Sequence, residues 1–511
     1  MIRTTTTTII LSIILILIVV EVKGKCALPP YVLPRELPEK LPQTIEIALK
    51  KIEALLDLET SKLSGKVPSV VVGIAYNQRL LYSKGFGKVN TTGSGEIVPS
   101  PSQTLYPIAS VTKVFTALLM LQMRDEMGLD LDAPLRAYLP GFSIRNPYFP
   151  SKRDLTLRAL SSHLAGLPRN TPCQNPCNLT NSEMLARIAQ LVLVTPPYTA
   201  PMYSNLGFSL LGHALSAVGG ASYQDLIEKN ILAPLGMTNS AFNLSPAQLD
   251  RVAQSANPFV VQGWDVPAGG LYSTADDMVA LIQLILTLTD PQQNSGLVLD
   301  GWSLREWTQQ QLWTDPNGIQ SQGMPWENRF VAGQWTNYKG GSFPGYTSGL
   351  WIAPDINLGF FVSTTSGAEP FLSAEISAIL FPAVDSYIRD IQPRDLLPPS
   401  HLAFVGNFVT STGASFSFSV RNASGFQFLA LDVSSPPFPM LRFLGLDNHS
   451  QVASFRVTPL PDPARSNLDI CNSFTGGIYF EYVYFQLNQF GTSALSLTIP
   501  GILWDTIAFR S

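Results

Sequence analysis

Residues 107–121 read PIASVTKVFTALLML, in which a short polar opening leads into a long apolar run. Ser110 and Lys113 stand three residues apart at its start, and residues with this spacing share one face of a helix. We predict a helix that runs from Ser110 to Gly128, because glycine is a frequent helix stop. The segment therefore places a hydroxyl beside an amine, and it contains no histidine that could act as a base.

The pair Ser110 and Lys113 suits nucleophilic catalysis. A serine hydroxyl is a weak nucleophile until another group removes its proton. Burial disfavours the charged form of a lysine, so a buried Lys113 could remove that proton. The backbone amide of Ser110, at a helix start, could also donate to an oxyanion. The pair alone is a weak signal, because an ordinary amphipathic helix can show the same spacing.

The segment PMYSNLGFSLLGHAL (201–215) adds a second group of polar residues at a predicted helix start. A tyrosine can relay protons when nearby ammonium groups lower its pKa, which would suit Tyr203. Asn205 could hold both Lys113 and a substrate amide. The alternative interpretation is a helix cap with a buried tyrosine.

The segment YKGGSFPGYTSGLWIAPD (338–355) adds a third group, and we predict that Lys339 begins a strand. The charge of Lys339 could bind a substrate carboxylate, and Gly341 leaves room for a ligand along the backbone. The amide of Ser342 could complete an oxyanion hole. The alternative interpretation is a glycine-rich hairpin.

The ordered set Ser-x-x-Lys, Tyr-x-Asn and Lys-x-Gly resembles the serine β-lactamase and penicillin-binding protein superfamily, in its class C β-lactamase-related branch. The likeness covers residues 45 to 390 and includes LTLRALSSHLAGLP (155–168). It implies an α+β fold of the β-lactamase/transpeptidase type, with an antiparallel sheet flanked by helices and a helical subdomain. The tail resembles the barrel-like domains appended to some of these proteins, including secreted fungal ones.

The resemblance also implies a role for each candidate residue. Ser110 would be the nucleophile, Lys113 its activating partner and Tyr203 the general base and acid. The substrate-binding residues would be Asn205, Lys339, Gly341 and Ser342, with the Ser110 and Ser342 amides forming the oxyanion hole. We expect His163 to be structural, because it is far in sequence from the nucleophile.

One position departs from the family pattern. Many members that recognise β-lactams have Lys-Thr-Gly where this chain has Lys339-Gly340-Gly341. The missing hydroxyl removes a contact to a substrate carboxylate that is worth about 1–3 kcal/mol. We therefore expect the hydrolysis of esters or amides rather than of antibiotics.

Three functions are compatible with these motifs. The first is a serine hydrolase that acts on ester or amide bonds through a Ser110 acyl-enzyme. The second is an acyltransferase of secondary metabolism that uses the same acyl-enzyme, and the third is an inert binding protein. No metal or cofactor is expected, because the four histidines form no zinc motif and a Gly-x-Ser-x-Gly elbow is absent. The expected partner is a small or peptide-like substrate.

Composition and local sequence patterns indicate the class of protein and its domain organisation. The chain has 511 residues, 45% hydrophobic and 14% charged, with a net charge of −4 and no basic cluster, which disfavours nucleic-acid binding. We predict that residues 1–24 are a secretory signal, with an uncleaved membrane anchor as the alternative. The predicted domains that follow are a proline-rich lead (25–44), a catalytic domain (45–392), a linker (393–400) and an all-β domain (401–511), where apolar residues alternate with period two.

The four cysteines fit an exported protein. We predict a Cys173–Cys177 disulfide within CQNPC and a Cys26–Cys471 disulfide, with free thiols as the alternative. Glycosylation sequons occur at Asn90, Asn178, Asn243, Asn422 and Asn448. The sequence leaves the oligomeric state open.

Overall fold

The computed structural model divides into two compact units, one ending at Ile391 and one that includes Gln392–Ser511. It describes residues 40–62, 69–90, 97–99, 102–148, 154–255, 261–287, 298–314 and 319–391 of the first unit. In the second unit it describes residues 401–411, 413, 415–423, 426–432, 440–447, 452–458, 482–488, 493–498 and 507–510. The predicted signal, the linker at 393–400 and the Cys26–Cys471 pair lie outside these ranges.

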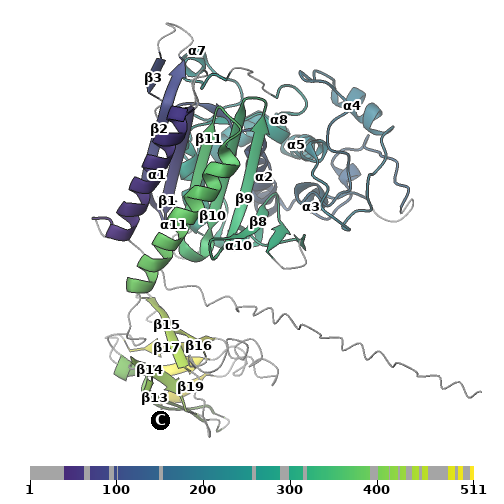
Figure 1. Cartoon of the computed structure of the whole chain (residues 1–511). Helices are drawn as coiled ribbons and strands as arrows, with labels where there is room; N and C mark the ends of the chain where they lie inside the picture. Colours follow the sequence, from purple (N-terminus) through teal and green to yellow (C-terminus); the bar gives the residue numbers. More distant parts are fainter. Residues whose placement is uncertain are drawn as a thin grey trace, which may run out of the picture. The chain divides into compact units, whose positions relative to one another are not determined.

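An antiparallel sheet forms the centre of the first unit (Figure 1). Its strand order is β3-β2-β1-β11-β10-β9-β8-β7-β6, so the early strand β1 pairs with the late strand β11. The strands are β1 (Ser69–Tyr76), β2 (Arg79–Asn90), β3 (Ile97–Pro99), β6 (Leu312–Trp313), β7 (Gln320–Gln322), β8 (Glu327–Val331), β9 (Gln334–Phe343), β10 (Tyr346–Ala353) and β11 (Leu358–Thr364). The predicted antiparallel sheet is confirmed, and segments distant in the sequence complete it. Strands β1, β10 and β11 are buried along their whole length, which explains why their sequences are mostly apolar.

Helices cover both faces of this sheet. Helices α1 (Gln43–Lys62) and α11 (Glu369–Ile391) pack together on one face, and α9 (Ala275–Leu286) packs against β1 and β11 (Figure 1). Helix α11 is long and apolar enough to span a membrane, and half of its apolar window is buried inside the unit. Its buried side chains include Leu372, Ile376, Leu380 and Val384, so packing in the core accounts for its composition.

Further helices surround the sheet, and α3 (Leu157–Ser161), α4 (Asn181–Ile188) and α5 (Asn205–Gly219) lie together to one side of it, as the predicted helical subdomain (Figure 1). Helix α2 (Thr112–Met127) is buried on all sides from Thr112 to Met123, which explains why its sequence is an apolar run. Gly128 ends it in the left-handed conformation, as predicted. The others are α6 (Tyr223–Ile227), α7 (Pro246–Leu249), α8 (Val266–Gly269) and α10 (Gly301–Trp307).

The second unit is a closed antiparallel barrel in its described part, which confirms the predicted all-β character of the tail. Its strands are β12 (Gly406–Val409), β13 (Ser415–Ala423), β14 (Phe426–Leu431), β15 (Met440–Asp447), β16 (Val452–Thr458), β17 (Tyr482–Leu487), β18 (Ala494–Thr498) and β19 (Ala508–Arg510). Pairing of β12 with β19 closes it. Phe404, Phe408, Phe418 and Phe485 make ring contacts in its core, as the alternating pattern requires.

Candidate active site

Ser110 lies in a short 3₁₀ helix, η1 (Ala109–Val111), directly before α2. The α-helix therefore begins at Thr112, two residues later than the sequence predicts. Ala109 has φ +49°, a left-handed conformation that costs a non-glycine residue about 1–3 kcal/mol and is often found at functional sites. This turn places Ser110, half-buried, on the wall of a cavity.

Lys113 is fully buried beside Ser110. Its Nζ donates to Ser110 Oγ at 3.0 Å, to Asn205 Oδ1 at 2.9 Å and to the Ala268 carbonyl at 2.5 Å. Burial lowers the pKa of this group, while Tyr203 and Glu327 oppose that shift, and the three donated hydrogen bonds use the three protons of the ammonium form. The predicted contacts from Lys113 to Ser110 and to Asn205 are both present in the structure.

Tyr203 directly precedes α5, and Ser204 caps that helix by accepting from the Gly207 amide. Lys113, Lys339 and Arg169 each lie close to the Tyr203 ring, with charged groups 5.1, 5.1 and 5.0 Å from its centroid. Burial alone raises the pKa of Tyr203, but Lys113, Lys339 and the Ser110 hydrogen bond outweigh it and lower the pKa to about 8. A phenol with this pKa can exchange a proton near neutral pH.

Residues 338–343 of β9 form one side of the cavity, which we call the strand wall. Lys339 is buried and its Nζ donates to Glu327 Oε1 at 2.7 Å. Although burial alone lowers the pKa of Lys339, Glu327 and Tyr203 raise it overall, so the group stays charged. Lys339 does not begin the strand as predicted, because β9 starts five residues earlier, at Gln334, where it pairs with β8.

Gly341 allows the strand wall to approach the nucleophile. A Cβ atom at this position would lie 2.3 Å from the Ile108 carbonyl oxygen and 3.0 Å from the Ser110 nitrogen. Any side chain here would therefore force β9 away from η1. At Gly340 a Cβ would lie 2.4 Å from the Tyr338 hydroxyl, so a phenol fills the space beside this residue.

The segment 163–177, which we call the loop wall, also contributes to the cavity, through Arg169, Asn170, Thr171, Cys173 and Asn175. Its backbone carbonyls hold the segment around Tyr203: Pro168 accepts from Ser204 Oγ at 2.6 Å, and Arg169 accepts from the Asn205 amide at 2.7 Å. Asn170 Oδ1 accepts from Asn205 Nδ2 at 3.0 Å. The loop wall thus positions the residues predicted to act on the substrate.

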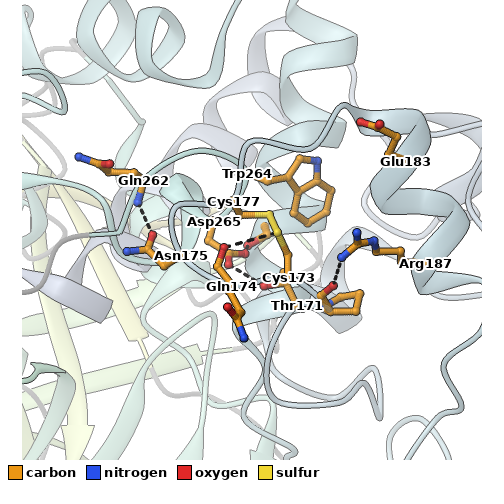
Figure 2. The surroundings of a disulfide bond; sticks show 12 residues. Thr171, Cys173, Gln174, Asn175, Cys177, Glu183, Arg187, Gln262, Trp264 and Asp265 are labelled. Atoms are coloured by element: carbon orange, nitrogen blue, oxygen red, sulfur yellow. Dashed lines mark hydrogen bonds between the residues drawn. A yellow bond between two sulfur atoms is a disulfide. The ribbon is translucent and has the colours of Figure 1, made fainter.

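A Cys173–Cys177 disulfide closes the far end of the loop wall, as predicted (Figure 2). The Cys177 carbonyl accepts from the Trp264 amide at 2.8 Å, and Thr171 Oγ1 donates to Asp265 Oδ2 at 2.6 Å. The loop wall is therefore attached to the segment before α8 as well as to the start of α5.

His163 is buried and does not line the cavity, which agrees with the structural role that the sequence suggested. Its ring stacks on Tyr203 with 4.4 Å between centroids, and its Nδ1 accepts from the Ser204 amide at 3.1 Å. Burial and the nearby cations, Lys113 first among them, lower its pKa well below 6.5, so the ring is neutral. Because Nδ1 is an acceptor, the proton sits on Nε2, which is buried without a hydrogen-bond partner among the described residues.

The cavity has a volume of about 940 Å³. Six of the seven predicted site residues line it, namely Ser110, Tyr203, Asn205, Lys339, Gly341 and Ser342. Lys113 stands behind them and reaches Ser110 and Asn205. Sequence reasoning did not single out Arg169, Glu327 or Tyr338, which also line the cavity and carry no motif of their own.

The site combines a serine that is hydrogen-bonded to a buried lysine with a neighbouring tyrosine of lowered pKa, beside β9 of a helix-covered antiparallel sheet. This combination defines a class of serine hydrolases. The family model described as beta-lactamase matches residues 48–381. The chain therefore belongs to the beta-lactamase family.

Known relatives agree with this assignment. Beta-lactamase-like protein 4 of Dictyostelium discoideum is 32% identical over 379 residues, which cover 67% of this chain and 65% of that protein. The D-alanyl-D-alanine-carboxypeptidase/endopeptidase AmpH of Escherichia coli is 31% identical over 232 residues, 44% of this chain and 58% of AmpH. A beta-lactamase/D-alanine carboxypeptidase from Yersinia pestis has the same fold, with a TM-score of 0.54, 23% identity and coverage of 66% of this chain and 99% of that structure.

Proposed function

We propose that the protein hydrolyses ester or amide bonds through an acyl-enzyme on Ser110. The observation that carries the proposal is the hydrogen bond from the buried Lys113 to Ser110, with Tyr203 at a pKa of about 8 beside both. A fold that only bound ligands would gain no stability from a buried lysine held this way, because burying an ammonium group is costly.

Acylation begins with proton transfer. Tyr203, as the phenolate, takes the proton of Ser110, and Oγ attacks the substrate carbonyl carbon to give a tetrahedral oxyanion. The backbone amides of Ser110 and Ser342 are the groups that we expect to stabilise this oxyanion. The bond to the leaving group then breaks, Tyr203 returns its proton to the leaving oxygen or nitrogen, and an alcohol or amine departs.

Deacylation repeats these steps with water. Tyr203 takes a proton from water, the resulting hydroxide attacks the acyl carbon, and the bond to Ser110 Oγ breaks. Ser110 recovers the proton from Tyr203 and a carboxylic acid leaves. Lys113 and Lys339 stabilise the phenolate throughout, because both ammonium groups lower the pKa of Tyr203.

A fluorophosphonate probe tests the proposal directly. We expect covalent labelling at Ser110, located by mass spectrometry, and the loss of both labelling and ester hydrolysis in Ser110→Ala. Labelling at another residue, or turnover that survives in Ser110→Ala, would refute it. Turnover only with an added alcohol or amine acceptor would identify an acyltransferase instead.

We also propose that the protein is exported. The Cys173–Cys177 disulfide supports this, because disulfides persist mainly in oxidising compartments. Mass spectrometry of the mature N-terminus tests it: a chain that starts at Lys25 is expected, and one that keeps residues 1–24 would contradict the predicted signal cleavage.

A further inference from the structure

The positive charge of the strand wall is already compensated. Lys339 Nζ bonds to Glu327 at 2.7 Å, and Arg329 lies 3.7 Å from the other oxygen of the same carboxylate. Glu327 itself lines the cavity. A substrate carboxylate that approached Lys339 would meet this carboxylate as well, so Lys339 attracts it much less than a lone ammonium would.

The space beside Gly340 is also unsuited to an anion. The Tyr338 hydroxyl occupies it and donates to Glu369 Oε2 at 3.3 Å, so its proton is already engaged. Glu369 is buried and lines the cavity on the same side. Glu327 of β8 and Glu369 of α11 therefore place two carboxyl groups against the strand wall, next to the position at which the sequence predicted a bound carboxylate.

The loop wall presents the opposite arrangement. Arg169 lines the cavity, its side chain is exposed, and none of the described carboxylates forms an ion pair with it. Its guanidinium lies over the Tyr203 ring, 5.0 Å from the centroid, and so close to the reacting groups. Guanidinium groups bind carboxylates through two parallel hydrogen bonds, and a group near water can receive such a ligand at low desolvation cost.

Hydrogen bonds fix the backbone that carries Arg169 relative to the catalytic residues. The Arg169 carbonyl accepts from the Asn205 amide at 2.7 Å, and the neighbouring Asn170 bonds to the Asn205 side chain. Thr171 is fixed by Asp265, which also accepts from Ser209 on α5 at 2.8 Å. The backbone that carries Arg169 is thus bound to the catalytic segment on both sides, so an anion held by Arg169 has a defined position relative to Ser110.

We propose that Arg169 is an anion subsite and that the preferred substrates are esters or amides that carry a carboxylate. The inference rests on the proposed function and adds the substrate class. Arg169 determines specificity and does not take part in bond making, so its loss should affect anionic substrates and spare neutral ones.

Matched chromogenic esters test the subsite. The 4-nitrophenyl esters of succinic and butyric acid differ by a carboxylate on the acyl side, and 3-carboxyphenyl and phenyl butyrate differ by one on the leaving side. Arg169 can bind a carboxylate on only one side of the reacting bond. In the native protein we therefore expect the anionic ester of either the acyl-side or the leaving-side pair to have a kcat/KM about 10- to 100-fold higher than that of its neutral partner. In Arg169→Gln that preference should vanish while neutral esters change less than about threefold.

Two control variants sharpen the comparison. Arg169→Lys keeps the charge but not the paired donors, so we expect partial retention of the preference. Arg305→Gln, on α10 and outside the cavity, removes the same charge elsewhere and should leave the preference intact. Equal kcat/KM within both ester pairs in the native protein, or an unchanged preference in Arg169→Gln, would overturn the proposal.

Binding to an inert variant separates this proposal from the catalytic one. In Ser110→Ala, calorimetry with the amide analogues of both ester pairs measures recognition without turnover: N-(4-nitrophenyl)succinamic acid against N-(4-nitrophenyl)butanamide, and 3-butanamidobenzoic acid against N-phenylbutanamide. We expect tighter binding of the acid in one pair, and loss of that difference in Ser110→Ala/Arg169→Gln. Equal affinities within both pairs would refute the subsite even if Ser110 is labelled, and a difference that Arg169→Gln removes would support it even if Ser110 is not labelled.

Discussion

The two walls of the cavity are built in different ways. The strand wall (338–343) is part of a regular sheet: backbone pairing fixes it, its buried lysine is neutralised by Glu327, and a glycine faces the nucleophile. The loop wall (163–177) has irregular backbone, held by a disulfide and by bonds to the segment around Tyr203, and it carries an exposed arginine. Both walls hold groups of the site in place, but of the two only the loop wall carries an exposed charge, and we propose that this charge selects the substrate.

Tyr203→Phe should have the largest effect, because this tyrosine contacts both walls. The ring packing remains, and the loss of the proton relay should lower kcat by about 10²–10⁴-fold. In the native protein kcat/KM should rise with pH through about 8, since the pKa of Tyr203 is lowered to about 8 and the phenolate is the active form. The rise should be absent in Tyr203→Phe, and a phenylalanine variant with the native pH profile would assign the base elsewhere.

Gly341→Ala, in the strand wall, should cause the second-largest loss of kcat. The new methyl would collide with the backbone at Ile108 and Ser110, so we expect about a 100-fold loss of kcat and destabilisation by about 1–3 kcal/mol. Gly340→Ala is the matched control, because its methyl meets the Tyr338 side chain, which can shift. Thermal unfolding and kcat of the two variants check this, and equal losses would show that closeness to Ser110 is not the reason for Gly341.

His163 tests whether the loop wall only positions catalytic groups. His163→Phe keeps the ring but leaves the Ser204 amide without an acceptor, so we expect about a 10-fold loss of kcat. His163→Asn supplies an acceptor in place of Nδ1 and should restore much of it. The pH profile should keep its midpoint near 8 in both, because the ring is neutral; a large shift would show that a charged His163 tunes Tyr203.

The disulfide should have the smallest effect on chemistry. Replacing Cys173 and Cys177 by serine removes a cross-link over a short loop, worth about 2 kcal/mol of stability. We expect neutral esters to be hydrolysed within about threefold of the native rate, because the bonds from Pro168 and Arg169 to α5 remain. Parallel unfolding and kinetic measurements check this, and a large loss of kcat on neutral esters would show that the strand wall cannot hold the chemistry alone.

Sequence predicted the parts of the site that depend on spacing along one element. The contact of Ser110 with Lys113 follows from their three-residue spacing on a helical segment, and the end of α2 follows from the glycine at position 128. The sheet also followed, because its central strands are buried and mostly apolar. These patterns are local, so a single sequence contains them.

The contacts that sequence missed join separate segments. The ion pair of Lys339 with Glu327 depends on the β8–β9 hairpin, whose turn passes through Ala332 and Gly333 with positive φ. The stacking of His163 on Tyr203 joins residues forty positions apart in irregular backbone. No periodicity encodes either contact, so the sequence alone does not show that His163 packs on Tyr203.

The carbonyl groups of Pro168 and Arg169 have a consequence for protein engineering. The main-chain carbonyls of Pro168 and Arg169 accept hydrogen bonds from Ser204 and Asn205. These two bonds therefore do not depend on which side chains stand at positions 168 and 169. A library that varies position 169 and the exposed positions 174 and 175 should therefore keep a high proportion of active clones with altered selectivity. The same number of changes in residues 339–341 should yield mostly inactive clones. For the same reason, we expect relatives that differ in substrate choice to differ mainly in the loop wall.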